Sequence, residues 1–108
     1  MPTAEDTAAE RSARYEDACD KAYAWAERAT TEYGQAIRHD DDARARQHSD
    51  NAWQRDRMNE ERRLAQFHGV RSTEALKLAE MWAKVATSLI PPLEPVWTEL
   101  ESADVSTP

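Results

Sequence analysis

The sequence contains little glycine, little cysteine and no long apolar run. Its two glycines, Gly34 and Gly69, lie far apart, which excludes a glycine-rich phosphate-binding loop. Cys19 is the only cysteine, so no intrachain disulfide can form and the fold does not depend on an oxidising compartment. No apolar stretch approaches the ~20 residues of a membrane-spanning helix. We therefore expect a cytoplasmic protein, because the N-terminus also lacks the basic and apolar parts of a signal peptide.

A basic region is also missing. The chain has 14 Lys and Arg against 21 Asp and Glu, a net charge of −7, and none of the regions 1–37, 38–63 and 64–108 is basic overall. A general nucleic-acid binder needs a basic surface to neutralise phosphates, so we expect no nucleic-acid partner. Arg outnumbers Lys 11 to 3, which together with the alanine content is typical of a GC-rich bacterial or phage genome.

Large apolar side chains are few for 108 residues. Hydrophobic residues make up 40% of the chain, but 19 of them are Ala, which bury little area. Small domains are already marginally stable, and this composition gives only a thin core. Charged residues reach 32%, a composition typical of long helices and coiled coils. Self-association would supply the missing burial.

The N-terminal part predicts one long helix over residues 3–67. Thr3 is a good N-cap, and Asp6 completes a capping box. The middle, residues 38–63, has seven Arg and seven acids and almost no large apolar residue. Its helicity would come from i,i+4 ion pairs such as Asp42–Arg46 and Arg57–Glu61, each worth ~0.2–0.5 kcal/mol. Gly34 and Asp40–Asp42 are the candidate breaks, and Gly69 is a C-cap signal for a turn at residues 68–71.

A second helical arm is predicted over residues 72–101, with Ser72 as its N-cap. Pro91-Pro92 should end or kink the helix near Ile90. Residues 102–108 are expected to form a flexible tail. The predicted fold is one all-α unit over residues 1–108, a coiled-coil-like hairpin with a long N-terminal helix folding back onto a shorter, Pro-kinked arm. The alternative is a three-helix bundle that breaks near Asp40–Asp42.

Two apolar patterns predict contact surfaces. Residues spaced alternately by four and three form a seam of small and aromatic side chains, which we predict to mediate self-association: Tyr15, Cys19, Ala22, Ala26, Ala29 and Tyr33. The C-terminal arm carries the largest apolar stripe, which we predict to be a partner interface: Trp82, Leu89, Ile90, Leu93, Val96, Trp97 and Leu100. The expected partners are a second copy of the chain, another helical protein, or both.

No catalytic, cofactor or metal site is predicted. Cys19 has no His at a helical neighbour position, so a buried structural thiol is favoured over a nucleophile. His39 and His48, with Asp40–Asp42 and Asp50, form the nearest approach to a metal cluster. The two His lie nine positions apart, too far along a straight helix to share one ion. The sequence thus favours a non-catalytic helical scaffold, adaptor or assembly component.

Two short segments carry a resemblance. Phe67-His68-Gly69 has the form aromatic-x-Gly, and Trp97-Thr98-Glu99-Leu100-Glu101 has the form aromatic-x-x-x-acid. Together they resemble the turn and the downstream signal of small acidic helical hairpins of the Trp-x-Gly type, which type VII systems secrete. The resemblance covers only these residues, has Phe in place of Trp, and meets arms of unequal predicted length. It implies a secreted hairpin as an alternative function. A second alternative function is that of a regulatory partner subunit of a larger protein.

Overall fold

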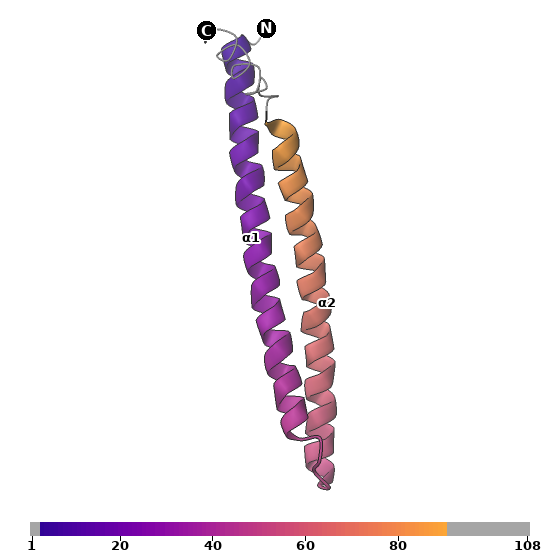
Figure 1. Cartoon of the computed structure of the whole chain (residues 1–108). Coiled ribbons are helices and arrows are strands. Elements are labelled where there is room, and N and C mark those ends of the chain that lie inside the picture. Colours follow the sequence, from indigo (N-terminus) through magenta and orange to yellow (C-terminus); the bar gives the residue numbers. More distant parts are fainter. Residues whose placement is uncertain (1–2, 91–108) are drawn as a thin grey trace, which may run out of the picture.

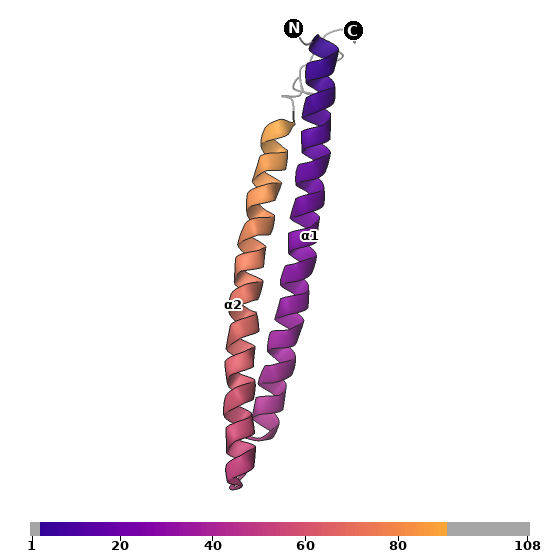
Figure 2. The same ribbon diagram turned by 180° about the vertical axis from the view of Figure 1, so that it is seen from behind.

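Two long helices form an antiparallel hairpin. The computed structural model describes residues 3–90, in which α1 spans Ala4–Ala45 and α2 spans Ala52–Leu89. The two helices lie side by side along their whole common length (Figures 1 and 2). The longest dimension is 82 Å, and the radius of gyration is 24.6 Å, whereas a compact domain of this length would have about 13 Å. The predicted all-α helical hairpin is confirmed.

The hairpin turns at residues 46–51. Arg46 caps α1, donating its backbone N–H to the carbonyl oxygen of Ala43, and the chain reverses through polar residues. Asn51 then begins α2, because its Oδ1 accepts a hydrogen bond from the backbone N–H of Trp53 at 2.8 Å. A side-chain oxygen at this position satisfies a backbone donor that the first turn of a helix leaves without a partner.

The predicted position of the turn is wrong. We expected helix 3–67 to end at a turn over residues 68–71, but α2 passes through Gly69 without a break. Ser72 is not an N-cap either: its Oγ donates to the carbonyl oxygen of Ala29 on α1 at 2.8 Å. The gain from packing an unbroken inner face exceeds the ~1 kcal/mol that a glycine costs inside a helix.

The two breaks proposed within the first helix are also absent. α1 is continuous through Gly34 and through Asp40–Asp42, so the alternative three-helix bundle is wrong for the described residues. Ion pairs along the helix support this stretch: Arg44 Nε lies 3.1 Å from Asp40 Oδ2, and Arg46 Nε lies 3.6 Å from Asp42 Oδ1. Such i,i+4 pairs favour helix in a segment that has few apolar residues.

Both predicted outer ends are confirmed. Thr3 Oγ1 accepts from the backbone N–H of Asp6 at 3.1 Å, and the Asp6 carboxylate accepts from the backbone N–H of Thr3 at 3.2 Å, which completes the capping box. α2 ends at Leu89, and Ile90 is extended, with φ −72° and ψ 124°, as expected for a residue before proline. The predicted helix beyond Pro92 and the tail at 102–108 lie outside the described residues.

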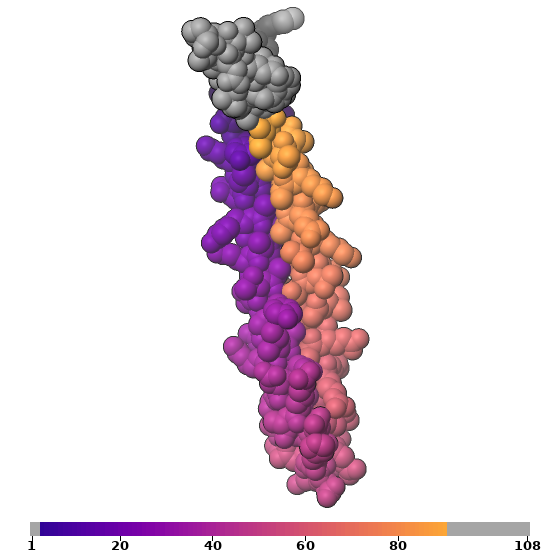
Figure 3. Space-filling model, viewed as in Figure 1, coloured from indigo at the N-terminus to yellow at the C-terminus, as the bar shows by residue number. Residues whose placement is uncertain are grey.

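The helices pack through small residues. The buried residues within 3–90 are six alanines and one acid, Glu61, and no large apolar side chain is fully buried. The buried and half-buried inner positions repeat at alternate spacings of three and four: Ala18, Ala22, Trp25, Ala29, Glu32, Ala36, His39 and Ala43 on α1, and Glu61, Ala65, His68, Ser72, Ala75, Ala79, Trp82 and Ala86 on α2. Alanine at half of these positions lets the backbones approach closely. Figure 3 shows the resulting rod, with the two helices in contact along its length.

Candidate functional site

Two reciprocal Glu–His pairs lie between the helices. His39 on α1 hydrogen-bonds through Nδ1 to the carboxylate of Glu61 on α2. In the second pair the acid is on α1 and the imidazole on α2: Glu32 Oε2 and His68 Nδ1 lie 2.5 Å apart. Glu32 and His39 are seven residues apart, as are Glu61 and His68, so each helix contributes one acid and one imidazole to neighbouring layers.

The two imidazoles also touch each other. The rings of His39 and His68 stack with centroids 5.4 Å apart and planes inclined by 7°. Phe67 meets the edge of His68 at 5.2 Å. The four polar side chains therefore form one connected cluster within a row of alanines, which we call the Glu–His cluster: Glu32, His39, Glu61 and His68.

Arginines complete the charge balance of this cluster. Arg71 Nε lies 3.2 Å from Glu32 Oε1, and Arg57 Nη2 lies 3.6 Å from Glu61 Oε1. The pKa of Glu32 is held below its ordinary value, first by the hydrogen bond from His68 and then by Arg71, although partial burial works in the opposite direction. The Glu61 side chain is only 5% exposed, and a buried carboxylate is costly unless it is paired. The alignment of the two helices that pairs these groups is therefore lower in free energy than an alignment shifted along the helix axis.

The carboxylates of the Glu–His cluster are already paired. Both carboxylates already hold imidazole and arginine partners, and within residues 3–90 no group of three or more His, Cys, Asp or Glu is placed to hold a metal ion. His48, which the sequence placed near His39, lies in the turn, where its Nε2 is 3.1 Å from Gln47 Nε2. The Glu–His cluster was not predicted from the sequence. The seven-residue spacing of each Glu and His was the available signal.

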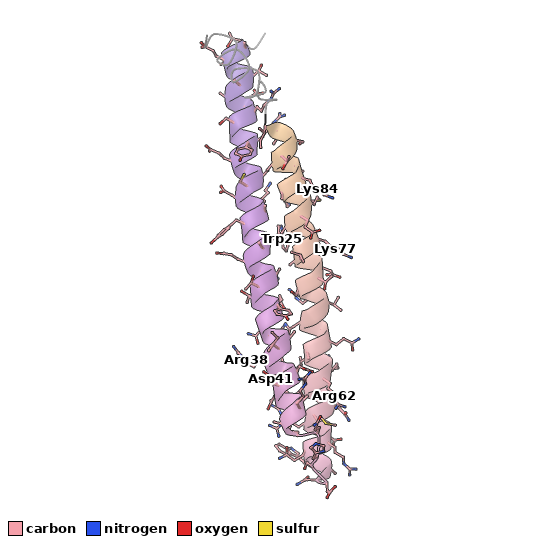
Figure 4. The ribbon with its side chains drawn as sticks, in the orientation of Figure 1. Trp25, Arg38, Asp41, Arg62, Lys77 and Lys84 are labelled. Carbon is pink, nitrogen blue, oxygen red and sulfur yellow. The ribbon has the colours of Figure 1, made fainter. Side chains whose placement is uncertain are left out.

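Two of the tryptophans, Trp25 and Trp82, lie farther from the turn than the Glu–His cluster does. Trp82, a predicted partner-interface residue, is half-buried against α1, with Lys21 Nζ 4.4 Å from its ring centroid. Trp25 on α1 lines a shallow hollow with Arg71, Ala75 and others, and Figure 4 shows it at about the height of Lys77 on α2. Both rings therefore contribute to the hairpin itself. Trp53, at the start of α2, is 63% exposed, with the Arg46 guanidinium 5.9 Å from its ring.

The predicted self-association seam divides between two surfaces. Ala29 is buried and Ala22 is half-buried, both facing α2. Ala26 and Tyr33 are exposed, Tyr15 is 38% exposed and Cys19 is half-buried at the edge. The seam thus mixes inner positions of the hairpin with positions on its outside. The hydrogen bond with Cys19 is the main cause that raises the pKa of Tyr15 above its ordinary value.

The predicted partner interface is described only in part. Leu89 is half-buried and Ile90 is 46% exposed at the end of α2. Both line a hollow together with Ser12 and Tyr15 of α1. Leu93, Val96, Trp97 and Leu100 lie outside the described residues, as does the second segment of the Trp-x-Gly resemblance. The first segment, Phe67-His68-Gly69, lies in the middle of α2 instead of at the turn.

One side of the hairpin is poor in charged residues, and we call its uncharged members the tyrosine face. Its α1 part comprises Cys19, Tyr23, Ala26, Thr30, Tyr33 and Ile37. Its α2 part comprises Gly69, Leu76, Ala83 and Ile90. Ile90 lines the hollow with Ser12, and the three other α2 members precede Ile90 at intervals of seven, which places them on the same side. Tyr33 is 59% exposed and Leu76 is 50% exposed.

The opposite side is lined with arginines. Arg28 and Arg71 line the hollow beside Trp25, and the Arg71 guanidinium lies 5.4 Å from the ring of Phe67. Apolar residues on this side, such as Phe67 and Leu78, are therefore interrupted by charge. The hairpin has two different long sides: arginines lie on this one, and the members of the tyrosine face carry no charge.

Comparisons with protein-family models, with curated proteins and with solved structures find no match to this chain. Within residues 3–90, neither helix combines enough length and apolar character to cross a membrane.

Proposed function

We propose that this protein is a non-catalytic helical scaffold or assembly component that works through helix–helix contacts and self-association. Its partners would be further copies of itself, another helical protein, or both, with no role in binding nucleic acid or membranes. The single cysteine fits a reducing compartment such as the cytoplasm.

The distribution of apolar residues carries this proposal. The buried apolar side chains of residues 3–90 are all alanines, whereas eleven large hydrophobic residues on the same stretch are exposed. Single exposed apolar residues are common, but contiguous ones mark interaction surfaces. Residues 3–90 form only two helices and offer no third layer on which to bury these side chains, so contact with a partner would bury them.

The polar features support a structural role. The Glu–His cluster is satisfied internally, and the hollows on the described surface are shallow grooves along the helices. A nucleophile would need a base beside it, and the side chain that hydrogen-bonds with Cys19 is Tyr15. The arrangement specifies how two helices align and offers no chemistry to a substrate.

The alternative of a hairpin secreted by a type VII-like system has one observation in its favour. The arms are nearly equal, 42 and 38 residues, where the sequence had predicted unequal arms. The turn at residues 46–51 lacks the aromatic-x-Gly pattern, which weakens the resemblance. Recovery of the chain from culture medium only when a type VII system is intact would favour this alternative.

Sedimentation velocity with small-angle scattering over a concentration series tests the main proposal. Self-association predicts a concentration-dependent species of at least twice the chain mass of 12.3 kDa. A monodisperse elongated monomer at all concentrations would remove self-association from the proposed function and leave only binding to a different protein.

A further inference from the structure

We infer that the tyrosine face is the surface on which a second copy of this chain docks, antiparallel to the first, to form a four-helix bundle. This inference rests on the proposed function and assigns it to one side of the hairpin. The observations that carry it are the scarcity of charge on that face, its area, and the distribution of charge at its two ends.

The tyrosine face carries little charge in a highly charged chain. Charged residues make up 32% of the sequence, whereas the ten members of this face are uncharged. The acid Glu27 borders it, in one groove with Tyr23 and Ala26. Tyr23, Tyr33 and Ile37 are exposed there, as are Leu76 and Ile90. Tyrosine is enriched at protein interfaces, because its ring is apolar and its hydroxyl can find a polar partner.

Small residues between the large ones allow close approach. Ala26 and Ala83 are exposed, and a Cβ added to Gly69 would meet nothing within 4 Å. Large side chains from a second hairpin can therefore fit beside these positions, as small and large residues do at helix–helix contacts. Small and large side chains also meet between the two helices of the hairpin, where Trp25 and Ala75 line the same hollow.

The area matches that of a stable dimer. From Gly69 to Ile90 the face is about 32 Å long at ~1.5 Å per residue, and two adjacent helices are about 20 Å wide. This gives roughly 640 Å² on each copy, within the ~600–1,000 Å² per partner of a standard stable interface.

The charges that border the face differ between its two halves. Toward the open end, Glu16 and Glu80 lie beside it, at helical positions adjoining Tyr23 and Ala83. Toward the turn, Arg55 and Arg62 continue the line of Gly69 at intervals of seven. Within residues 3–90 none of these four takes part in an ion pair, whereas Asp40 at the turn end is paired with Arg44. Arg62 lies at the level of Arg38 and Asp41, near the turn (Figure 4).

These halves make the face complementary to itself in one orientation. An antiparallel second copy places the acidic half of one face against the basic half of the other. A parallel copy would place like charges together, which is unfavourable. A second copy in the antiparallel orientation is therefore the occupant that this face fits.

Two exposed aromatic residues provide a matched test. Tyr33→Glu places a charge on the tyrosine face, and Phe67→Glu places the same charge on the arginine side, where the native ring is 48% exposed. In sedimentation velocity of the full chain, Tyr33→Glu should raise the dimer Kd about 10-fold or more, while Phe67→Glu should change it little. Both variants should keep their helical circular dichroism, because neither side chain is buried.

The outcomes separate this inference from the proposed function. A wild-type dimer that Tyr33→Glu leaves intact would overturn the tyrosine face as the interface, with self-association still standing. A dimer that only Phe67→Glu weakens would move the interface to the arginine side and overturn the inference in the same way. A wild-type chain that stays monomeric would overturn both.

A charge exchange tests the orientation. Arg62→Glu alone should weaken the dimer, because acids then meet acids in the antiparallel arrangement. Glu16→Arg combined with Arg62→Glu should restore the Kd to within about 3-fold of the wild type, since opposite charges again face each other. A double variant no better than Arg62→Glu alone would overturn the antiparallel orientation.

Discussion

Glu32 and His68 come from opposite helices, 36 positions apart in sequence, and Glu32 Oε2 lies 2.5 Å from His68 Nδ1. This polar contact is embedded in a row of alanines, where the packing of small side chains alone would permit several alignments. A shift of one helix by a turn would leave the Glu side chains without their imidazole and arginine partners. The pair therefore selects the register of the hairpin, in the way that buried polar residues specify register in coiled coils.

The stability of the hairpin should fall in mild acid because of Glu32. The folded state holds the pKa of Glu32 below its ordinary value of 4.5, so folding favours the ionised carboxylate. That contribution is present above the unfolded pKa and is lost as the pH falls through the folded pKa. We expect the urea midpoint to decrease between about pH 5.5 and pH 3. Circular dichroism at a fixed protein concentration measures it.

Glu32→Gln identifies the source of this pH dependence. It should flatten the decrease in midpoint, whereas Glu10→Gln, at an exposed position of α1, should leave it as in the wild type. Equal slopes in the wild type and in Glu32→Gln would show that Glu32 does not couple folding to protonation.

The His39–Glu61 pair should behave as a coupled unit. Glu61→Ala alone removes a carboxylate that is nearly buried and leaves His39 without its partner, which should cost about 1–3 kcal/mol. Replacing both by Ala should cost less than the two single changes together, with a coupling of about 0.5–3 kcal/mol. Urea unfolding of the four proteins in the cycle measures the coupling. The exposed pair Glu60–Arg63 is the control, and its cycle should be close to additive.

The fold was predictable where local signals act alone. Thr3 with Asp6 marks a helix start by residue type, and Pro91 ends a helix because it lacks an N–H. The position of the turn was not predictable, because a glycine such as Gly69 acts as a C-cap only where the helix ends for another reason. Tertiary packing decides that question: His68 and Ser72, on either side of Gly69, both contact α1. The true turn depends on Asn51, a cap within a uniformly polar stretch.

The contact surfaces were predictable only in part. The predicted seam of heptad spacing includes Ala22 and Ala29, which do face α2. It also includes Ala26 and Tyr33, which lie on the outside. The spacing of three and four fits two adjacent stripes of one helix, and only the position of α2 distinguishes them. Glu61 was counted among surface charges, because its burial depends on a His that is distant in sequence.

Ala26 and Ala29 should respond differently to the same substitution. Ala26→Glu places a charge on the tyrosine face and should weaken assembly while the hairpin stays folded. Ala29, only 7% exposed, faces α2, so Ala29→Glu should destabilise the hairpin by several kcal/mol. Helical circular dichroism and sedimentation velocity on the same samples separate the two effects. Loss of helix in Ala26→Glu, with Ala29→Glu intact, would exchange the inner and outer sides of α1.

Metal ions should not change the stability of the protein. His39 is engaged with Glu61, and His48 lies in the turn, so the acidic run Asp40–Asp42 has no imidazole free to join it. A ligand that binds only the folded state must raise its stability by mass action. We expect the melting temperature to be the same with EDTA, with zinc and with magnesium near stoichiometric concentration. A reproducible rise of several degrees with one of these ions would require a metal site.

Gly69→Ala tests the continuity of α2 directly. Gly69 lies inside a helix, has no positive φ, and has nothing within 4 Å of an added Cβ. Alanine should therefore stabilise the hairpin by about 0.5–1 kcal/mol, because it restricts the unfolded chain without a clash. Gly34→Ala, in α1 with equally open surroundings, is the matched control and should give a similar gain. If Gly69 instead ended a helix in the left-handed conformation, Gly69→Ala would lower the urea midpoint while Gly34→Ala raised it.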